Sequence, residues 1–398
     1  MSSEHPFSPS SPAAGLAVLA AEGVAGGHAA SSVEGAASGH AKSSVEGAAT
    51  GHATLAHEGV ATGHATMADV ARRAGVSIKS VSRVINKEPH VSPKLREKVE
   101  AAIATLDYVP DTAARSLAGS RSFTIGVLFD NPSPNYTMKM LMGAYAACID
   151  NSYHLRIDSL DSSRDQATVL AQLDAILRHS RSDGFVLTPP LTDNALVLDF
   201  LEQRGVAYAR IAPVLDPGRS PSVQIDDAGA SADVAQMLWD RGHRRFGLIN
   251  GRGDHGAAGT RRAGFLGRLR ELNPDVIVSE ATGGFSFDGG IAAGRELLSA
   301  RKHPTAFFAA NDDMAAGLMV ACAEMGLVVP RDVSVVGFDD SWVAMSVWPY
   351  LTTVYQPIEE MAREAATMLI ARHRSENLNV QAWLPYRIVE RASVGPAK

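Results

Sequence analysis

The residues whose types and spacing best suit a chemical task form a short group at positions 78–83. Ile78, Lys79, Ser80 and Arg83 fall on the side of a predicted helix that does not pack against its neighbour. A lysine, an arginine and a hydroxyl on one exposed helical face can hydrogen-bond to base edges in the major groove of DNA. This helix is therefore a candidate recognition helix.

Two short helices joined by a glycine turn would position this group. Thr66 and Asp69 have the spacing of a capping box, which predicts the start of the first helix. Gly75 is expected to end that helix, and Ser77 to cap the second. The apolar residues expected to pack between the helices are Val70, Ala71, Ala74, Val76, Val81, Val84 and Ile85. The pattern alone also fits a small surface hairpin with a solvated basic face.

A resemblance to a known family favours the DNA-binding helix-turn-helix over a surface hairpin. Three stretches, 68–86, 91–99 and 106–119, together resemble the DNA-binding headpiece of the lac repressor (LacI/GalR) family in residue types and order. Ser92 followed by Pro93 predicts the start of a third helix. The headpiece residues expected to contact DNA are Thr66, Ser77, Ile78, Lys79, Ser80, Ser82, Arg83, Asn86 and His90.

Residues 111–121 follow the headpiece and are rich in alanine and arginine. In the resembling family this segment is a hinge helix that forms when two subunits lie side by side on DNA. The resemblance implies that Leu117, with Ala114 and Ala118 beside it, enters the minor groove and kinks the duplex. An ordinary linker is the alternative that composition leaves open.

The distribution of charge supports a DNA partner. The whole chain has a net charge of −6, which by itself argues against a nucleic-acid-binding protein. Residues 66–121, however, carry ten basic and six acidic side chains, so the positive charge is concentrated in the predicted headpiece. The two cysteines, Cys148 and Cys322, have no metal-binding or redox spacing, which favours a reducing compartment such as the cytoplasm. We therefore expect the protein to act on DNA in the cytoplasm.

Residues 1–65 form a low-complexity tail in which Gly-His recurs every 12 residues, at 27–28, 39–40, 51–52 and 63–64. We expect this tail to be disordered, because its composition buries too little apolar surface to offset the entropy of ordering. A 12-residue spacing turns a helix by about 120° per repeat, so the histidines do not share a face and no metal site is predicted. A second hypothesis is that translation starts at Met67.

From residue 122 the chain alternates apolar strands with helices, which predicts an α/β core with parallel sheets. Its length, 122–393, favours two lobes, and the resembling family has such a core, similar to periplasmic sugar-binding proteins. We expect chain crossings near 223–226 and 356–357, with the last strand, 386–390, returning to the first lobe. Predicted strands are 123–130, 155–160, 184–190, 206–212, 245–250, 276–281, 305–310, 333–340 and 351–356, and predicted helices include 137–151, 165–179, 228–241, 259–272 and 313–325.

Polar residues that follow these strands are candidates for binding a small molecule, since ligands of open α/β sheets bind beyond the carboxyl ends of strands. Arg261, Asn311 and Asp339 match the effector-binding positions of the resembling family. Together they suit a mono- or disaccharide, because vicinal hydroxyls can donate to a carboxylate and accept from a guanidinium or an amide. Phe285 or Trp342 is expected to supply an apolar face. Asp312 or Asp313 is expected to cap the helix that follows.

Asp130 and Asp193, at strand ends of the first lobe, are further effector-binding candidates. Gly251, Gly253 and Gly256 formally satisfy the dinucleotide fingerprint G-x-G-x-x-G. A turn, however, occupies the place about 20 residues later where a strand-ending acid should lie. We therefore expect no dehydrogenase activity, no cofactor and no catalytic residues.

These observations predict a transcriptional regulator, most simply a repressor of sugar-utilisation genes, that binds a near-palindromic operator as a homodimer. A small sugar bound between the two core lobes is expected to control it allosterically. A dimer is favoured because related tetramers carry an added C-terminal helix, whereas this sequence ends seven residues after Arg391. No stretch is long and apolar enough to predict a membrane span. A sugar-binding protein without a regulatory role is the alternative.

Overall fold

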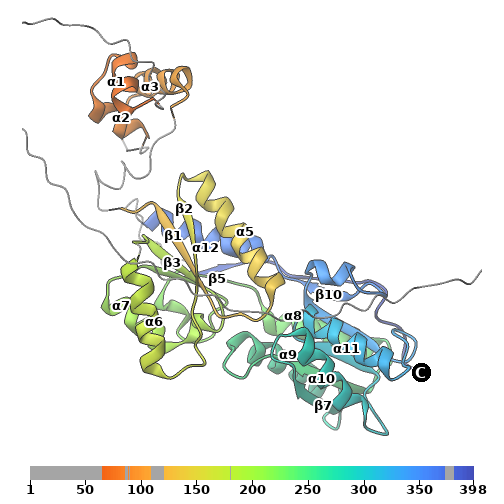
Figure 1. Ribbon diagram of the computed structural model, residues 1–398. Coiled ribbons are helices and arrows are strands. Elements are labelled where there is room, and N and C mark those ends of the chain that lie inside the picture. Colours follow the sequence, from red (N-terminus) through yellow and green to blue (C-terminus); the bar gives the residue numbers. More distant parts are fainter. Residues whose placement is uncertain (1–64, 86–87, 89, 109–120, 180, 373–380) are drawn as a thin grey trace, which may run out of the picture. The chain divides into compact units, whose positions relative to one another are not determined.

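The structure, a computed structural model, describes residues 65–85, 88, 90–108, 121–179, 181–372 and 381–398 (Figure 1). Asn86 and three hinge candidates, Ala114, Leu117 and Ala118, lie outside these residues, as does the tail up to residue 64. Over the described part of the chain, no helix is long and apolar enough to cross a membrane.

Three helices make up the N-terminal part of the described chain. They are α1 (Met67–Ala74), α2 (Ile78–Ile85) and α3 (Pro93–Leu106). Val70, Val81 and Val99 are fully buried among them, because each lies on the apolar stripe of its helix. The predicted helix-turn-helix is therefore confirmed as a packed three-helix unit.

The first core sheet has six parallel strands in the order β11-β5-β4-β3-β1-β2. Its strands are β1 (Thr124–Phe129), β2 (His154–Ser159), β3 (Gly184–Leu187), β4 (Tyr208–Ile211), β5 (Ser222–Gln224) and β11 (Gln381–Trp383). Helices α5 (Pro134–Asp150) and α12 (Ile358–Arg372) cover one face, and α6 (Gln166–His179) and α7 (Ala195–Gln203) cover the other (Figure 1). Both faces of the sheet are apolar and need a helical cover, because side chains of one strand alternate between the faces. In β1, for example, Ile125 and Leu128 point to opposite faces and into different apolar clusters.

The second sheet has the order β12-β10-β9-β8-β6-β7, and only β12 runs antiparallel. Its strands are β6 (Arg245–Asn250), β7 (Ile277–Thr282), β8 (Ala306–Ala309), β9 (Ser334–Asp339), β10 (Thr352–Tyr355) and β12 (Arg387–Val389). Helices α8 (Asp227–Asp240) and α9 (Gly256–Leu272) pack on one face, and α10 (Phe287–Leu298) and α11 (Asp312–Glu324) on the other. The predicted two-lobed α/β core is confirmed.

The chain passes between the two sheets three times, which corrects the sequence prediction of two crossings. It leaves the first sheet after β5, returns through α12 and β11, and enters the second sheet again at β12. The prediction that 386–390 joins the first lobe is therefore wrong, since β12 pairs with β10. Three-residue β5 and β11 were not predicted, because strands this short carry no readable alternation.

Two helix pairs cross at glycines. A Cβ atom added to Gly143 of α5 would lie 2.0 Å from the carbonyl oxygen of Glu359 at the start of α12. A Cβ added to Gly264 of α9 would lie 2.1 Å from the carbonyl oxygen of Ala228 in α8. These glycines are therefore needed for the close approach of the two backbones.

Candidate functional site

The start of α1 and the turn after it fix the orientation of α2. Thr66 accepts a hydrogen bond from the Asp69 backbone N–H, and the Asp69 carboxylate accepts one from the Thr66 N–H at 2.9 Å, which is the predicted capping box. The Thr66 hydroxyl also donates to the Asp69 carboxylate, at 2.6 Å, and this bond and the one from the Thr66 N–H lower the pKa of Asp69. Gly75 ends α1 with a φ of 64°, a left-handed conformation that favours glycine. The Ser77 hydroxyl accepts from the Ser80 N–H at 3.1 Å at the start of α2.

The outward side of α2 carries the candidate base-reading residues. Ile78 is 53% exposed, and Lys79 is also exposed. Ser80, Ser82 and Arg83 are half-buried, and His90 is exposed. Arg83 forms an ion pair with Glu88, with 3.2 Å between Nε and Oε2. Arg83 would have to exchange this partly exposed pair for a phosphate or a base to contact DNA.

A pocket lies between the two lobes. Its lining residues come from both lobes and lie after strands or near the starts of helices, as expected for an open α/β fold. The lining residues are Asn131, Ser133, Tyr136, Pro189, Ala212, His255, Ala257, Arg261, Phe285, Asn311, Asp339 and Gln356. The structure therefore brings together the predicted Arg261, Asn311, Asp339 and Phe285.

Arg261 is held by four groups at the base of this pocket. Its Nε donates to Asp227 at 2.7 Å, and its two terminal nitrogens donate to the Ala310 carbonyl at 2.6 Å and to Gln356 Oε1 at 3.0 Å. The guanidinium also lies 3.6 Å from the centre of the Phe338 ring. Burial raises the pKa of Asp227, and the Arg261 charge opposes that shift. Arg261 is therefore part of a buried ion pair as well as of the pocket wall.

Asp339 places a buried carboxyl group in the pocket wall, and one of its oxygens, Oδ1, lacks a hydrogen-bond partner among the described residues. Burial raises the pKa of this carboxyl well above its usual range, Arg261 opposes the shift, and Asp312 and Asp313 add to it. Its backbone φ of 112° is rare for a non-glycine residue, and such strain is concentrated at functional sites.

Asn311 links α11 to the loop that carries Phe285. Asn311 Oδ1 accepts from the Met314 N–H at 2.9 Å, so Asn311 is the helix cap and the expectation of Asp312 or Asp313 in that role is wrong. Its Nδ2 donates to the Phe285 carbonyl at 3.1 Å. Phe285 is buried with a φ of 64°, and its ring forms part of the pocket wall.

The other three predicted effector residues lie outside the pocket lining. Asp130 accepts from the Ser162 N–H and hydroxyl, and so stabilises a loop of the first lobe. Trp342 is 66% exposed and donates to Asn135. Asp193 accepts from two backbone N–H groups, described below. Asp130 directly follows β1 as predicted, whereas Asp193 ends the 3-10 helix η1 (Leu191–Asp193) that comes after β3. The sequence could not show that local loops already use the oxygens of both acids.

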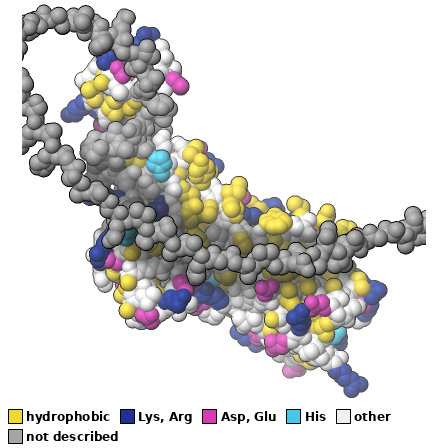
Figure 2. All heavy atoms as spheres, in the orientation of Figure 1, with side chains coloured by type: hydrophobic (Ala, Val, Ile, Leu, Met, Phe, Trp, Pro, Cys, Tyr) yellow, Lys and Arg dark blue, Asp and Glu magenta, His cyan; other side chains and the backbone are white. Residues whose placement is uncertain are grey.

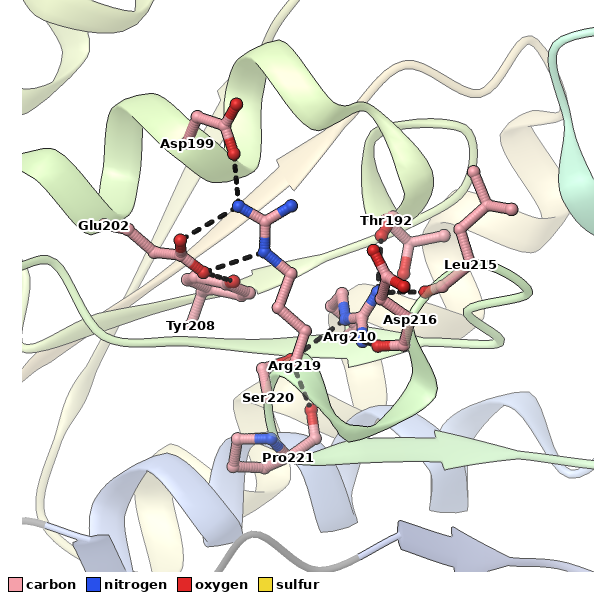
Figure 3. Close-up of polar contacts among 10 residues, drawn as sticks. All are labelled: Thr192, Asp199, Glu202, Tyr208, Arg210, Leu215, Asp216, Arg219, Ser220 and Pro221. Carbon is pink, nitrogen blue, oxygen red and sulfur yellow. Dashed lines mark hydrogen bonds and ion pairs between the residues drawn. The ribbon is translucent and has the colours of Figure 1, made fainter.

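Loop 212–221 presents Ala212 to the pocket. Figure 3 shows the contacts of the two arginines that fix this loop, Arg210 and Arg219. The fully buried Arg210 donates to the carbonyls of Leu215 and Asp216 and to Ser220 Oγ. Arg219 pairs with Glu202 and Asp199. The Asp193 carboxylate accepts from the N–H groups of Val214 and Leu215 at 3.0 and 2.9 Å. This loop is therefore a preformed part of the pocket wall.

Helix α5 makes direct contacts with the second lobe at its N-terminal end. The Ser133 hydroxyl and the Asn135 amide donate to Asp313 at 2.5 and 2.7 Å. Lys139 Nζ donates to the Asp340 carbonyl at 2.8 Å. We call Ser133, Asn135, Lys139 and Asp313 the lobe latch, because these contacts join the two lobes beside the pocket.

Sequence analysis missed Ser133, Tyr136, His255 and Gln356 as lining residues. Ser133, His255 and Gln356 lie in the loops after β1, β6 and β10, so the rule that ligands bind beyond strand ends could have included them. Tyr136 lies in the first turn of α5, where that rule does not point. Within the described part of the chain, no group of three or more His, Cys, Asp or Glu residues is placed to hold a metal ion.

Comparison with known proteins shows two matching domain families. The family described as "Bacterial regulatory proteins, lacI family" matches residues 66–111. The family described as "Periplasmic binding protein-like domain" matches residues 235–394. The headpiece and much of the core therefore each match a known domain.

Full-length relatives and solved structures match across both parts. The chain is 35% identical to the ribose operon repressor of Escherichia coli (strain K12) over 317 residues, 79% of this chain and 94% of that protein. It is 33% identical to the HTH-type transcriptional repressor PurR of Erwinia tasmaniensis over 335 residues, 82% and 96% of the two chains. A structure of the lac repressor dimer bound to operator and the anti-inducer ONPF has a TM-score of 0.65 and 28% identity, covering 83% of this chain and 99% of that one. A complex of transcriptional regulator CelR with cellobiose has a TM-score of 0.61, 30% identity and the same coverage.

Proposed function

The chain belongs to the lacI family of bacterial regulatory proteins, and from this premise we propose that it is a DNA-binding transcriptional repressor controlled by a small molecule. The observation that carries the proposal is the pocket between the lobes, where Arg261, Asn311 and Asp339 converge and one buried carboxylate oxygen lacks a partner within the described chain. We propose no enzymatic activity, since the relatives are named as repressors.

For the DNA-binding half, we propose a headpiece at 66–110 and a hinge at 111–121. Exposed Ile78 and Lys79 support a role for α2 in reading bases, and Arg83 lies on the same helix with an exchangeable ion pair. We assign Ser77 and Ser80, which bond to each other at the helix start, to contacts with the DNA backbone. A repressor acts on DNA, so we propose the cytoplasm as its location.

For the effector, we propose a mono- or disaccharide with one sugar ring seated in this pocket. Phe285 supplies a flat apolar wall for such a ring, while Asp339 and Arg261 supply an acceptor and a donor for its hydroxyls. The ribose operon repressor among the relatives supports a sugar ligand by its name.

We also propose that the protein acts as a homodimer, through two exposed apolar patches. Met138, Met142, Tyr145 and Ile149 are each more than half exposed and lie on one stripe of α5, where Figure 2 shows apolar side chains gathered. A second patch in the other lobe comprises Trp342, Met345, Trp348 and Tyr350. A two-fold axis beside these patches would pair two recognition helices with the two halves of a near-palindromic operator.

A combined DNA-binding and ligand-binding experiment tests the proposal. The protein should shift DNA from the region flanking its own gene in a gel, with a strong dependence on salt, and a mono- or disaccharide should change that affinity. Asp339→Ala should still shift the DNA but lose the response to the sugar. Binding of sugar without any sequence-specific DNA shift would instead support a sugar-binding protein without a regulatory role.

A further inference from the structure

His255 is a pocket residue that the proposed function does not yet use. It lies between β6 and α9, and only 6% of its surface is exposed. It lines the pocket, and its Nδ1 has no hydrogen-bond partner among the described residues. A buried polar atom without a partner is costly, so such an atom inside a ligand site points to a partner that the ligand brings.

The position of His255 in its helix gives independent support. His255 is the N-cap residue of the 17-residue α9, where serine, threonine, aspartate or asparagine is preferred because its side chain accepts from the first turn. The His255 side chain makes no such capping bond. The residue is therefore not explained by the needs of the helix.

The surroundings of His255 keep its ring neutral. Burial lowers its pKa to about 3, the charges of Arg261 and Arg252 act in the same direction, and Asp254 opposes them. A neutral imidazole presents one donor and one acceptor nitrogen. Its ring centre lies 4.5 Å from that of Phe285, so the two rings form one continuous wall of the pocket.

The charges of the lining residues restrict the class of ligand. Arg261 is the only lysine or arginine among the residues that line the pocket, and its charge is already matched by Asp227 at 2.7 Å. Asp339 is acidic and so adds no positive charge that would attract an anion. The site therefore offers hydrogen bonds to hydroxyl groups and no unmatched cation for a phosphate or a carboxylate.

We propose that His255 Nδ1 and Asp339 Oδ1 hydrogen-bond to hydroxyl groups of an uncharged sugar, so that His255 determines specificity and the site excludes phosphorylated sugars. This inference rests on the proposed function, because it takes the effector to be a sugar. A hydroxyl suits His255 in either tautomer, since it can both donate and accept.

The test is calorimetric titration of the full-length protein with D-ribose, with other neutral pentoses and hexoses, and with the matching sugar phosphates. His255→Leu removes the polar atom but keeps the site apolar and filled, whereas His255→Asn retains a polar atom near the place of Nδ1. His303→Leu, in the same lobe but outside the pocket lining, is the matched control. We expect His255→Leu to weaken binding of the preferred sugar at least tenfold, and His255→Asn and His303→Leu to stay within about threefold of the wild type.

Analogues of the preferred sugar that each lack one hydroxyl complete the test. For the wild type, one of these analogues should bind at least tenfold more weakly than the parent sugar. For His255→Leu, the same analogue and the parent sugar should bind with equal affinity. Operator binding by each variant verifies that the variant is folded. No sugar phosphate should bind measurably.

The outcomes separate this inference from the proposed function. Equal affinity of His255→Leu and wild type for the sugar, or preferential binding of a sugar phosphate, overturns the inference and leaves the sugar-controlled repressor standing. If the wild type binds operator but none of the sugars, the sugar effector itself is refuted, and the inference falls with it.

Discussion

Replacing Arg261 with methionine should destabilise the protein far more than the same change at its neighbour Arg262. Arg261 and Asp227 are both about 95% buried, and their ion pair at 2.7 Å is supplemented by bonds to Ala310 and Gln356. Removing one member of a buried pair leaves an uncompensated charge, which typically costs about 3–5 kcal/mol. Arg262 pairs with Glu280 at the surface, and such pairs contribute about 0–1 kcal/mol.

The assay is urea unfolding followed by circular dichroism, for wild type, Arg261→Met and Arg262→Met. A lower midpoint is expected for Arg261→Met, and a midpoint close to that of the wild type for Arg262→Met. Arg261→Met combined with Asp227→Asn should recover part of the loss, because the unpaired carboxylate is gone. Equal midpoints for the two single variants would refute the claim that this pair holds the second lobe together beneath the pocket.

The pH dependence of Arg261→Met follows from the raised pKa of Asp227. A raised pKa in the folded state favours the protonated acid, so the folded protein is relatively more stable at low pH and loses that advantage as the pH rises. Arg261 opposes this shift in the wild type, and its removal raises the pKa of Asp227 further. The difference in unfolding free energy between wild type and Arg261→Met should therefore grow from pH 5 to pH 8.

Three further predictions concern the headpiece, the dimer and the helix packing. Lys79→Ala should relax base preference at one operator position by about 1–3 kcal/mol, and Arg83→Ala should weaken operator binding. Both effects can be measured by fluorescence anisotropy with labelled operator. Unchanged affinities in both variants would contradict the assignment of α2 as the recognition helix. Met142→Glu should convert the dimer to a monomer in sedimentation velocity, and an unaltered dimer would remove α5 from the interface. Gly143→Ala should lower the free energy of unfolding by about 1–3 kcal/mol through overpacking, whereas Gly267→Ala, whose added Cβ meets nothing within 4 Å, should raise it by about 0.5–1 kcal/mol.

The sequence predicted the elements whose apolar pattern is long. Strands β6 and β9 and helices α6 and α8 were found within a residue or two, because buried runs and helical stripes extend over several residues. The partner of β12 could not be read in this way, since a three-residue strand carries no signal for the sheet it joins. The third crossing between the lobes was missed for the same reason.

The candidate site was predicted in part. Arg261, Asn311, Asp339 and Phe285 line the pocket as expected. Trp342 lies outside the pocket lining and is largely exposed; its residue type suits a sugar ring, but nothing in the sequence shows which way the side chain points. The assignment of the helix cap to Asp312 or Asp313 also failed, since asparagine and aspartate cap equally well and only the backbone geometry separates them.

Helix α5 combines two features that are usually separate. Its N-terminal residues form part of the lobe latch, and its exposed stripe is the proposed contact with a second subunit. A recombination event that exchanged this one helix between related regulators would therefore change the proposed subunit contact and the contacts between the lobes together. Duplicated genes could diverge in both properties by changes within these 17 residues, with the recognition helix left untouched.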